Sequence, residues 1–122
     1  MKLVIAGSRT VVNIQHLYNA ILTLDLGDVI RNEVTEIISG GANGADKLGE
    51  ILAAKLNKTL TIMPAEWDKY GKAAGYRRNE DMAELGDAVL VLYDGVSKGS
   101  KHMIELAKKH NKKVWVYYVY VS

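Results

Sequence analysis

Short apolar runs alternate along this chain with segments in which apolar residues return at helical spacing. The runs span residues 2–6, 34–39, 60–63, 87–93 and 114–121. Short runs rich in β-branched residues are typical of strands that are covered on both faces of a sheet. The only proline, at position 64, directly follows the third run and suits a strand end because it cannot donate to a sheet hydrogen bond.

Four further segments have the character of helices. Asn13 is a candidate N-cap for the first, in which apolar residues recur with a period near 3.6 residues. The second follows the glycine-rich residues 40–44 and continues to Leu56, and two more cover residues 77–85 and 100–110. Strands and helices therefore alternate along the whole chain.

This alternation predicts an α/β fold. Strands that alternate with helices form a parallel sheet through right-handed crossovers. We expect one domain over residues 1–122, a Rossmann-like, doubly wound, mainly parallel five-stranded sheet in the order 3-2-1-4-5 with helices on both faces.

Three loops with glycines follow the first, second and fourth strands, at residues 7–10, 39–46 and 94–100. In the order 3-2-1-4-5 these strands are neighbours, and the winding of the chain reverses between strands one and four. Ligands of open α/β sheets bind in the crevice at such a reversal. We therefore expect the three loops to converge on one ligand site.

The loops offer groups that suit a phosphate-bearing ligand. Glycines let the backbone approach a ligand closely, and the free N–H groups at the start of a helix bind anions. Asp46 and Asp94 are acceptors that suit ribose hydroxyls better than phosphate. Hydroxyl and cationic side chains could add donors: Ser8, Thr10, Ser39, Ser97, Ser100, Arg9, Lys98 and Lys101.

Structural roles compete with several of these assignments. The glycines of residues 40–44 could serve only as a tight connection between a strand and a helix. Asn43 and Asp46 also fit an N-cap and an acid three residues later, and Ser100 fits a cap. Arg9 directly follows a buried strand, where an unpaired guanidinium is costly, so we favour an anionic ligand over an internal carboxylate as its partner.

Residues 65–76 form a long connection without a firm period. Connections of this length are uncommon in compact domains unless they have a function. We interpret Trp67 and Tyr70 as packing residues under this loop rather than as a platform for stacking a base.

Composition narrows the function classes. The 122 residues carry a net charge of +2, contain no cysteine and only three scattered histidines, and include no apolar run near the roughly 20 residues of a membrane span. We expect a cytoplasmic protein with no metal and no membrane partner. The small charge and the few aromatic residues argue against nucleic acid as a partner, since nucleic-acid grooves combine basic tracks with stacking platforms.

Five motifs cover most of the chain. They read GSR at residues 7–9, SGGANGAD at 39–46, PAEW at 64–67, GKAAGYRRN at 71–79 and DGVSKGSKHMIELA at 94–107. In this order they resemble the SLOG superfamily, the Rossmann-like group named after the Smf/DprA and LOG proteins. More narrowly, they resemble its small single-domain YspA-like branch.

The resemblance implies a pocket for a nucleotide-type ligand. The superfamily includes phosphoribohydrolases, sensors of nucleotide or ADP-ribose-derived signals, and a DNA-processing branch. We therefore expect a sensor or sequestering module for a nucleotide-derived small molecule, with no further cofactor. The motifs would place these residues at the pocket: Gly7, Ser8, Arg9, Gly40, Gly41, Gly44, Asp46, Asp94, Gly95, Ser97, Gly99 and Ser100, with Arg78 and Asn79 reaching in from the helix before strand four.

The alternative is a nucleotide N-glycosidase of the phosphoribohydrolase type. Its catalytic residues would be Arg78, Asp94 and Glu105. The phosphoribohydrolases carry a PGGxGTxxE-like loop, whereas the loop here reads DGVSKGSKHMIE and lacks the acid at its usual spacing. The resemblance therefore favours binding over hydrolysis, and single-stranded nucleic-acid binding comes third.

The last strand is more aromatic than an edge strand needs. Residues 114–121 include Trp115, Tyr117, Tyr118 and Tyr120. Because exposed apolar edges tend to be covered, we expect this strand to pack on a partner subunit in a homo-oligomer.

Overall fold

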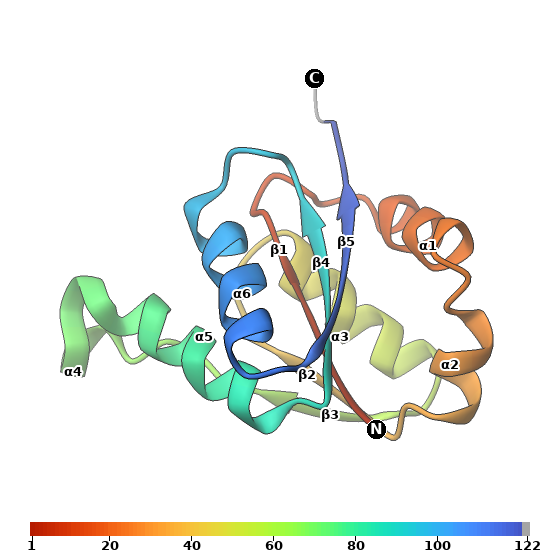
Figure 1. The fold of residues 1–122 in the computed structure, drawn as a ribbon, viewed down its shortest axis with the longest axis horizontal. Coiled ribbons are helices and arrows are strands. Elements are labelled where there is room, and N and C mark those ends of the chain that lie inside the picture. The colour runs from red at the N-terminus through yellow and green to blue at the C-terminus, as the bar shows by residue number, and fades with distance from the viewer. Residues whose placement is uncertain (121–122) are drawn as a thin grey trace.

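The structure, a computed structural model, describes residues 1–120 and contains one five-stranded parallel sheet (Figure 1). The strand order is β3-β2-β1-β4-β5, which confirms the predicted topology and the Rossmann-like fold. All four pairings are parallel, and β1 pairs with β2 on one side and with β4 on the other. The strands are β1 (Lys2–Gly7), β2 (Glu36–Ser39), β3 (Thr59–Ile62), β4 (Ala88–Tyr93) and β5 (Lys113–Tyr118).

The helices largely follow the predicted periodicity. They are α1 (Ile14–Thr23), α2 (Gly27–Asn32), α3 (Ala45–Lys55), α4 (Trp67–Tyr70), the 3₁₀ turn η1 (Gly71–Ala73), α5 (Ala74–Leu85) and α6 (Lys98–Lys109). Asn13 caps α1 by accepting a hydrogen bond from the Gln15 amide, as its side chain suggests. Three features differ from the prediction: α2 is an additional short helix, α5 begins three residues earlier, and α4 and η1 occupy part of the long connection.

Neither Asn43 nor Ser100, the two cap assignments that competed with ligand roles, is the N-cap of its helix. The N-cap of α3 is Gly44 rather than Asn43, because Gly44 adopts φ +83° and turns the chain into the helix. A β-carbon at this glycine would lie 2.5 Å from the backbone of Arg9, so only glycine fits between the two loops. The N-cap of α6 is Ser97, whose hydroxyl accepts a hydrogen bond from the Ser100 amide.

The two faces of the sheet carry separate apolar cores. Leu3 and Ile5 of β1 point to the face covered by α1, α2 and α3, whereas Val4 and Ala6 point to the face covered by α5 and α6 (Figure 1). All six residues of β4 are buried, as expected for a strand between two helical layers.

The end of the chain departs from the predicted last strand. β5 ends at Tyr118, after which the amide of Val119 donates to the carbonyl of Tyr93. Tyr118 and Tyr120 are exposed, whereas Trp115 and Tyr117 pack partly against the core beside α1 and α3. The final predicted strand residue, Val121, lies outside the described residues.

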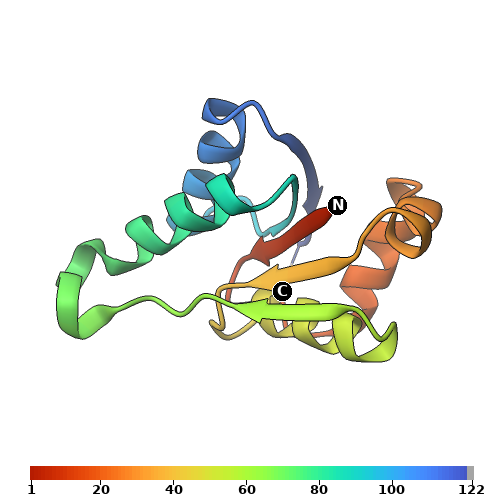
Figure 2. The same ribbon diagram turned by 90° about the horizontal axis from the view of Figure 1, so that it is seen from below.

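The segment from α4 to the start of α5 forms an arm that projects from the sheet (Figure 2). Neither α4 nor η1 contains a buried residue. Tyr70 does not pack under the loop in a core; its ring lies 4.0 Å from the guanidinium carbon of Arg77 instead. Among residues 1–120, no helix combines the length and the apolar character needed to cross a membrane.

Candidate functional site

A pocket of about 430 Å³ opens at the carboxyl ends of β1 and β4. The loop after β1, the loop after β2 and the loop after β4 all contribute to its walls, as the strand order predicts. The other walls come from α5 and from the projecting arm. The lining residues include Gly7, Arg9, Thr10, Ala42, Asp46, Trp67, Lys72, Tyr76, Arg78, Asn79, Asp94, Ser97, Gly99 and Ser100.

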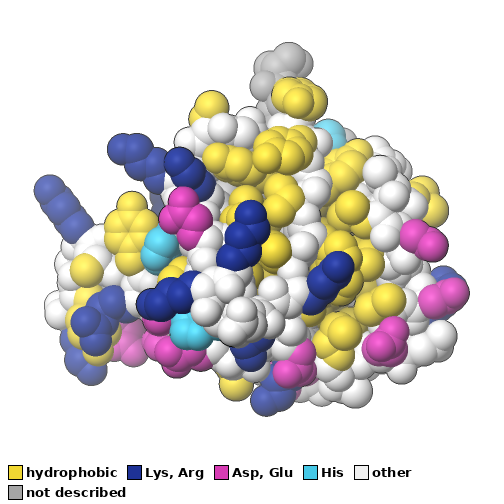
Figure 3. Space-filling view, viewed as in Figure 1, with side chains coloured by type: hydrophobic (Ala, Val, Ile, Leu, Met, Phe, Trp, Pro, Cys, Tyr) yellow, Lys and Arg dark blue, Asp and Glu magenta, His cyan; other side chains and the backbone are white. Residues whose placement is uncertain are grey.

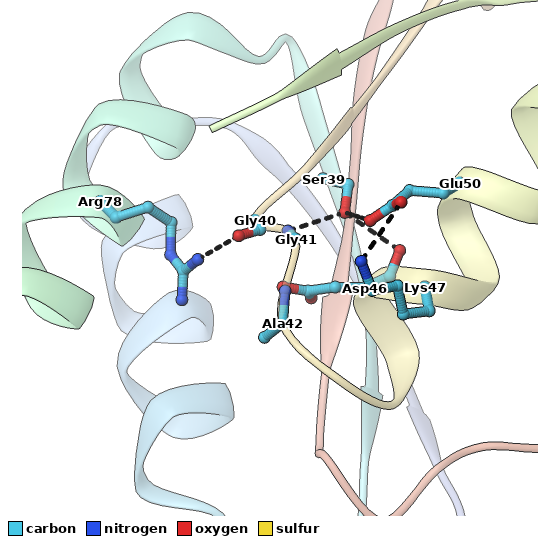
Figure 4. A network of polar contacts seen from close by, with 8 residues as sticks. All are labelled: Ser39, Gly40, Gly41, Ala42, Asp46, Lys47, Glu50 and Arg78. Carbon is cyan, nitrogen blue, oxygen red and sulfur yellow. Dashed lines mark hydrogen bonds and ion pairs between the residues drawn. The ribbon is translucent and has the colours of Figure 1, made fainter. Parts of the chain in front are cut away.

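The loop after β2 folds around two polar side chains (Figure 4). The buried Ser39 hydroxyl lies 3.0 Å from the carbonyl oxygen of Asp46 and 2.9 Å from a carboxylate oxygen of Glu50, and it accepts a hydrogen bond from the Gly41 amide. The Ala42 amide donates to Asp46 Oδ2. These contacts hold the loop against the first turn of α3, where Asp46 faces the pocket.

Asp46 is a carboxyl in an unfavourable place for a charge. Its side chain is buried, and desolvation raises its pKa from 3.8 to about 6, against the opposing influence of the Ala42 amide and of Arg78. Strongly shifted titratable groups in a pocket are candidates for function. Near neutral pH this group carries most of a negative charge and accepts hydrogen bonds, and slightly acidic pH protonates it.

Arg78 is held so that its guanidinium faces the pocket. Its Nη1 donates to the carbonyl of Gly40 at 2.5 Å, and its Nε donates to the side chain of Asn79. Asn79 in turn donates to the carbonyl of Gly99, at the start of α6. Burial lowers the pKa of Arg78, and the nearby Asp46 carboxyl opposes this effect.

Gly40 allows this approach. A β-carbon at position 40 would lie 2.5 Å from Nη1 of Arg78 and 2.7 Å from Oδ2 of Asp46. The side-chain ends of the two residues therefore meet over this glycine, which explains why the loop needs a residue without a side chain here.

A second set of contacts joins the loop after β1 to the loop after β4. The buried Ser8 hydroxyl lies 3.2 Å from the Ser100 hydroxyl and accepts a hydrogen bond from the Asp94 amide. One Asp94 oxygen accepts from the amides of Val96 and Ser97, and the other accepts from the Thr10 hydroxyl. These bonds lower the pKa of Asp94 and use both of its oxygens.

The structure brings most of the sequence-predicted ligand residues together. Ten of them line the pocket: Gly7, Arg9, Thr10, Asp46, Arg78, Asn79, Asp94, Ser97, Gly99 and Ser100. Ser8 and Ser39 are buried behind the pocket, where their hydroxyls hydrogen-bond to Ser100 and to the Asp46 carbonyl, and the Gly40 carbonyl accepts from Arg78. Gly41, Gly44, Gly95, Lys98 and the alternative catalytic residue Glu105 are not among its lining residues.

Five pocket residues on the arm and on α5 were not predicted from the sequence: Trp67, Lys72, Gly75, Tyr76 and Met82. Trp67 and Tyr76 are about half exposed, at 52% and 49%, and Lys72 is exposed. The Tyr76 ring also forms a T-shaped pair with the ring of His102 on α6, with 4.6 Å between the ring centroids. The unusual length of residues 65–76 was the available signal, because a long connection without a core role indicates a function.

Three cations and two carboxyls line the pocket: Arg9, Lys72, Arg78, Asp46 and Asp94. Figure 3 shows further Lys and Arg side chains on the outer surface of the half of the molecule that α4, α5 and α6 form, with Asp, Glu and His side chains among them. Among residues 1–120, no carboxylate oxygen lies within 4.0 Å of the guanidinium nitrogens of Arg9 or Arg78. Arg9 and Arg78 can therefore both face an anionic ligand.

One cluster of possible metal ligands lies elsewhere. Glu80, Glu84 and His110 place one ligand atom each within 4.8 Å of one another, where α5 meets the end of α6. Lys109 also approaches Glu80, at 3.4 Å, and the Glu80–His110 contact lowers the pKa of Glu80. This arrangement ties α5 to α6, and none of these side chains lines the pocket.

Comparison with known proteins gives a sequence relative and a fold neighbour. No family model matches the chain. The chain is 34% identical over 79 residues to the Gene 61 protein of Mycobacterium phage D29, a match that covers 60% of this chain and 63% of that protein. Its fold is similar, with a TM-score of 0.59 and 21% identity, to that of DNA processing protein A from Helicobacter pylori, over 95% of this chain and 64% of the other. The chain thus spans less than two thirds of either protein.

The fold match has two consequences. At 21% identity the match shows the fold alone, and this is the Rossmann-like fold that the SLOG resemblance implies. The match also overturns the prediction that argued against nucleic acid as a partner, because the neighbour is described by its single-stranded DNA binding mode. Association of this chain into a homo-oligomer is not tested by it and stays a prediction.

Proposed function

We propose that this protein binds a phosphate-bearing, nucleotide-derived ligand in the pocket at the carboxyl ends of β1 and β4 and acts as a sensor or sequestering module. The observation that carries the proposal is the pair of guanidinium groups, Arg9 and Arg78, that face one pocket without a carboxylate partner within 4.0 Å among residues 1–120. Arginine suits phosphate because its planar donors bind two oxygens at once.

The remaining walls supply groups for the rest of a nucleotide. The first turn of α6 adds the Gly99 amide and the Ser100 hydroxyl to the pocket, whereas the Ser100 amide already donates to the Ser97 cap. Asp46 is placed to accept from a ribose hydroxyl, and the half-exposed ring of Trp67 offers a face to a base. From the five sequence motifs, we also propose that the chain belongs to the YspA-like branch of the SLOG superfamily.

Binding is better supported than hydrolysis. Glu105 is exposed on α6 outside the pocket, and both oxygens of Asp94 accept hydrogen bonds within its own loops. An N-glycosidase would therefore depend on Asp46 as its acid, because Asp94, the other carboxylate among the lining residues, already accepts hydrogen bonds at both oxygens.

Isothermal titration calorimetry with AMP, ADP-ribose and NAD tests the proposal. We expect saturable binding that weakens roughly tenfold or more in Arg78→Ala, because a charge-assisted bond to phosphate is lost. Arg31→Ala is the matched control, since Arg31 lies on α2 and pairs there with Asp28. Absence of saturable binding in a folded sample, or equal loss in both variants, would contradict the proposal.

Single-stranded DNA is a second candidate ligand, favoured by the fold match. The same arginines would hold backbone phosphates, and Trp67 would stack on a base. Fluorescence anisotropy of a labelled oligothymidylate at physiological salt distinguishes this candidate. Binding should weaken as salt rises and should also depend on Arg78.

A further inference from the structure

A second hollow adjoins the pocket. It has a volume of about 370 Å³ and shares a wall with the pocket that consists of Arg9, Ala42, Trp67 and Arg78. Arg9, Arg78 and Trp67 thus lie between two adjacent spaces rather than at the end of one.

The two spaces differ in their other walls. The pocket is bounded by Asp46, Asp94 and the first turn of α6. The second hollow is bounded by the backbone of residues 40–43 and by Pro64 and Ala65, at the carboxyl ends of β2 and β3. Each could therefore hold a separate part of one ligand.

The sizes of the two spaces limit what those parts are. Ligand pockets commonly measure roughly 300–1,000 Å³, and both spaces lie in the lower part of that range. Each suits one nucleoside better than a whole dinucleotide. Only the shared wall carries arginines for both spaces, so a phosphate belongs between them.

We propose that the ligand contains two nucleoside units joined through phosphate, with one unit in each space and the linking phosphate on Arg9 and Arg78. This inference rests on the proposed function and specifies its ligand class. Trp67 lies at the boundary, where its ring can stack on the base of either unit. A free dinucleotide such as NAD and two neighbouring nucleotides of a DNA strand share this chemistry.

Fluorescence of Trp67 provides the assay. The chain has two tryptophans, so Trp115→Phe leaves Trp67 as the only one. In this background, thymidine monophosphate, the dinucleotide pTpT, the trinucleotide and NAD are titrated separately. We expect the dinucleotide to bind roughly tenfold or more tightly than the mononucleotide, as one additional stacked base predicts, and the trinucleotide to add less than this.

The comparison of pTpT with NAD distinguishes the two sources of the ligand: tighter pTpT indicates a DNA strand, and tighter NAD indicates a free dinucleotide. If neither exceeds the mononucleotide, the inference is wrong while the proposed function stands. If no compound, the mononucleotide included, binds saturably, the proposed function itself fails.

A variant that fills the second hollow gives an independent test. Ala65→Leu places extra volume there, and we expect the ratio of dinucleotide to mononucleotide affinity to fall towards one. Ala54→Leu, on the exposed face of α3, is the matched control and should keep the ratio of the parent protein. An unchanged ratio in a folded Ala65→Leu protein would overturn the inference.

Discussion

Replacing Asp46 with asparagine should change the pH dependence of folding in a direction that few carboxyl substitutions share. The carboxyl is 5% exposed and lies at the start of α3, over Gly40 and beside Arg78. Asparagine has nearly the same shape and can still accept a hydrogen bond from the Ala42 amide through its Oδ1. The substitution therefore removes the ionisation and little else.

The expected magnitude follows from the pKa of Asp46. The group ionises near 3.8 in the unfolded chain but only near 6 in the folded protein. Between these values the unfolded state loses its proton first, so wild-type stability falls as pH rises. At about 1.36 kcal/mol per pKa unit, the total loss is roughly 3 kcal/mol, and it is complete above about pH 6.

Urea denaturation followed by circular dichroism at a series of pH values measures this effect. Asp46→Asn should gain stability relative to wild type as pH rises through the interval and should hold that gain above it. Asp94→Asn is the contrasting variant, because loop amides lower the pKa of Asp94. In the wild type, the stabilising contribution of ionised Asp94 is present above the ordinary pKa of an aspartate and is lost as the pH falls through its lowered pKa. Asp94→Asn should therefore lose stability relative to the wild type as the pH rises.

The stabilities of Asp46→Asn and Asp94→Asn relative to the wild type should thus change in opposite directions with pH. If the free-energy difference between Asp46→Asn and wild type does not change with pH, the carboxyl is not desolvated as described. If it changes in the same direction as Asp94→Asn, the pKa of Asp46 is lowered rather than raised.

The same carboxyl should couple ligand binding to pH. An anion on Arg78 raises the pKa of Asp46 further, so binding takes up a proton. We expect ADP-ribose, whose pyrophosphate stays ionised in this range, to bind wild type more tightly just below about pH 6 than well above it. Calorimetry on Asp46→Asn should show a much flatter profile.

Three further substitutions have definite expected outcomes. Gly40→Ala should displace Arg78 and weaken ADP-ribose binding roughly tenfold or more, as measured by calorimetry. The free energy of unfolding from urea denaturation should fall by only about 1–2 kcal/mol, because the side-chain ends that meet the new methyl group can move. Ser8→Ala leaves the Asp94 amide without its hydrogen-bond partner and should lower the free energy of unfolding by about 1–3 kcal/mol in the same assay. An unchanged free energy of unfolding would contradict a stabilising role for this hydrogen bond. Gly7→Ala would put a β-carbon 2.1 Å from a backbone carbonyl oxygen of β4 and should cost about 3 kcal/mol or more; a near-neutral result would refute that close approach.

Sequence patterns were sufficient to predict the sheet and the convergence of the three loops at one edge of it. Alternating runs and helical periods predict a parallel sheet, and the simple doubly wound order 3-2-1-4-5, which the structure confirms, brings Arg9, Asp46 and Asp94 to one edge. The same reasoning could not assign roles to the carboxyls. Burial of Asp46 and the bonds that occupy Asp94 depend on three-dimensional packing.

The arm shows why the other pocket residues were missed. From the sequence, we interpret Trp67 as a packing residue and assign no role to Tyr76, because a sequence cannot show whether an aromatic ring packs in a core. Short elements such as α4 and η1 have too few residues for a period to appear. The exposed rings became candidates only when the arm was seen to project beside the arginines.

In the proposed function, the pocket binds an anion between Arg78 and the first turn of α6. An NMR titration of isotope-labelled protein with ADP-ribose tests it most directly, by following backbone amides and arginine Nε–H signals together. We expect the Arg78 Nε–H and the Gly99 amide to shift in one saturable process. Shifts confined to α2 around Arg31, or no shifts at all, would contradict it.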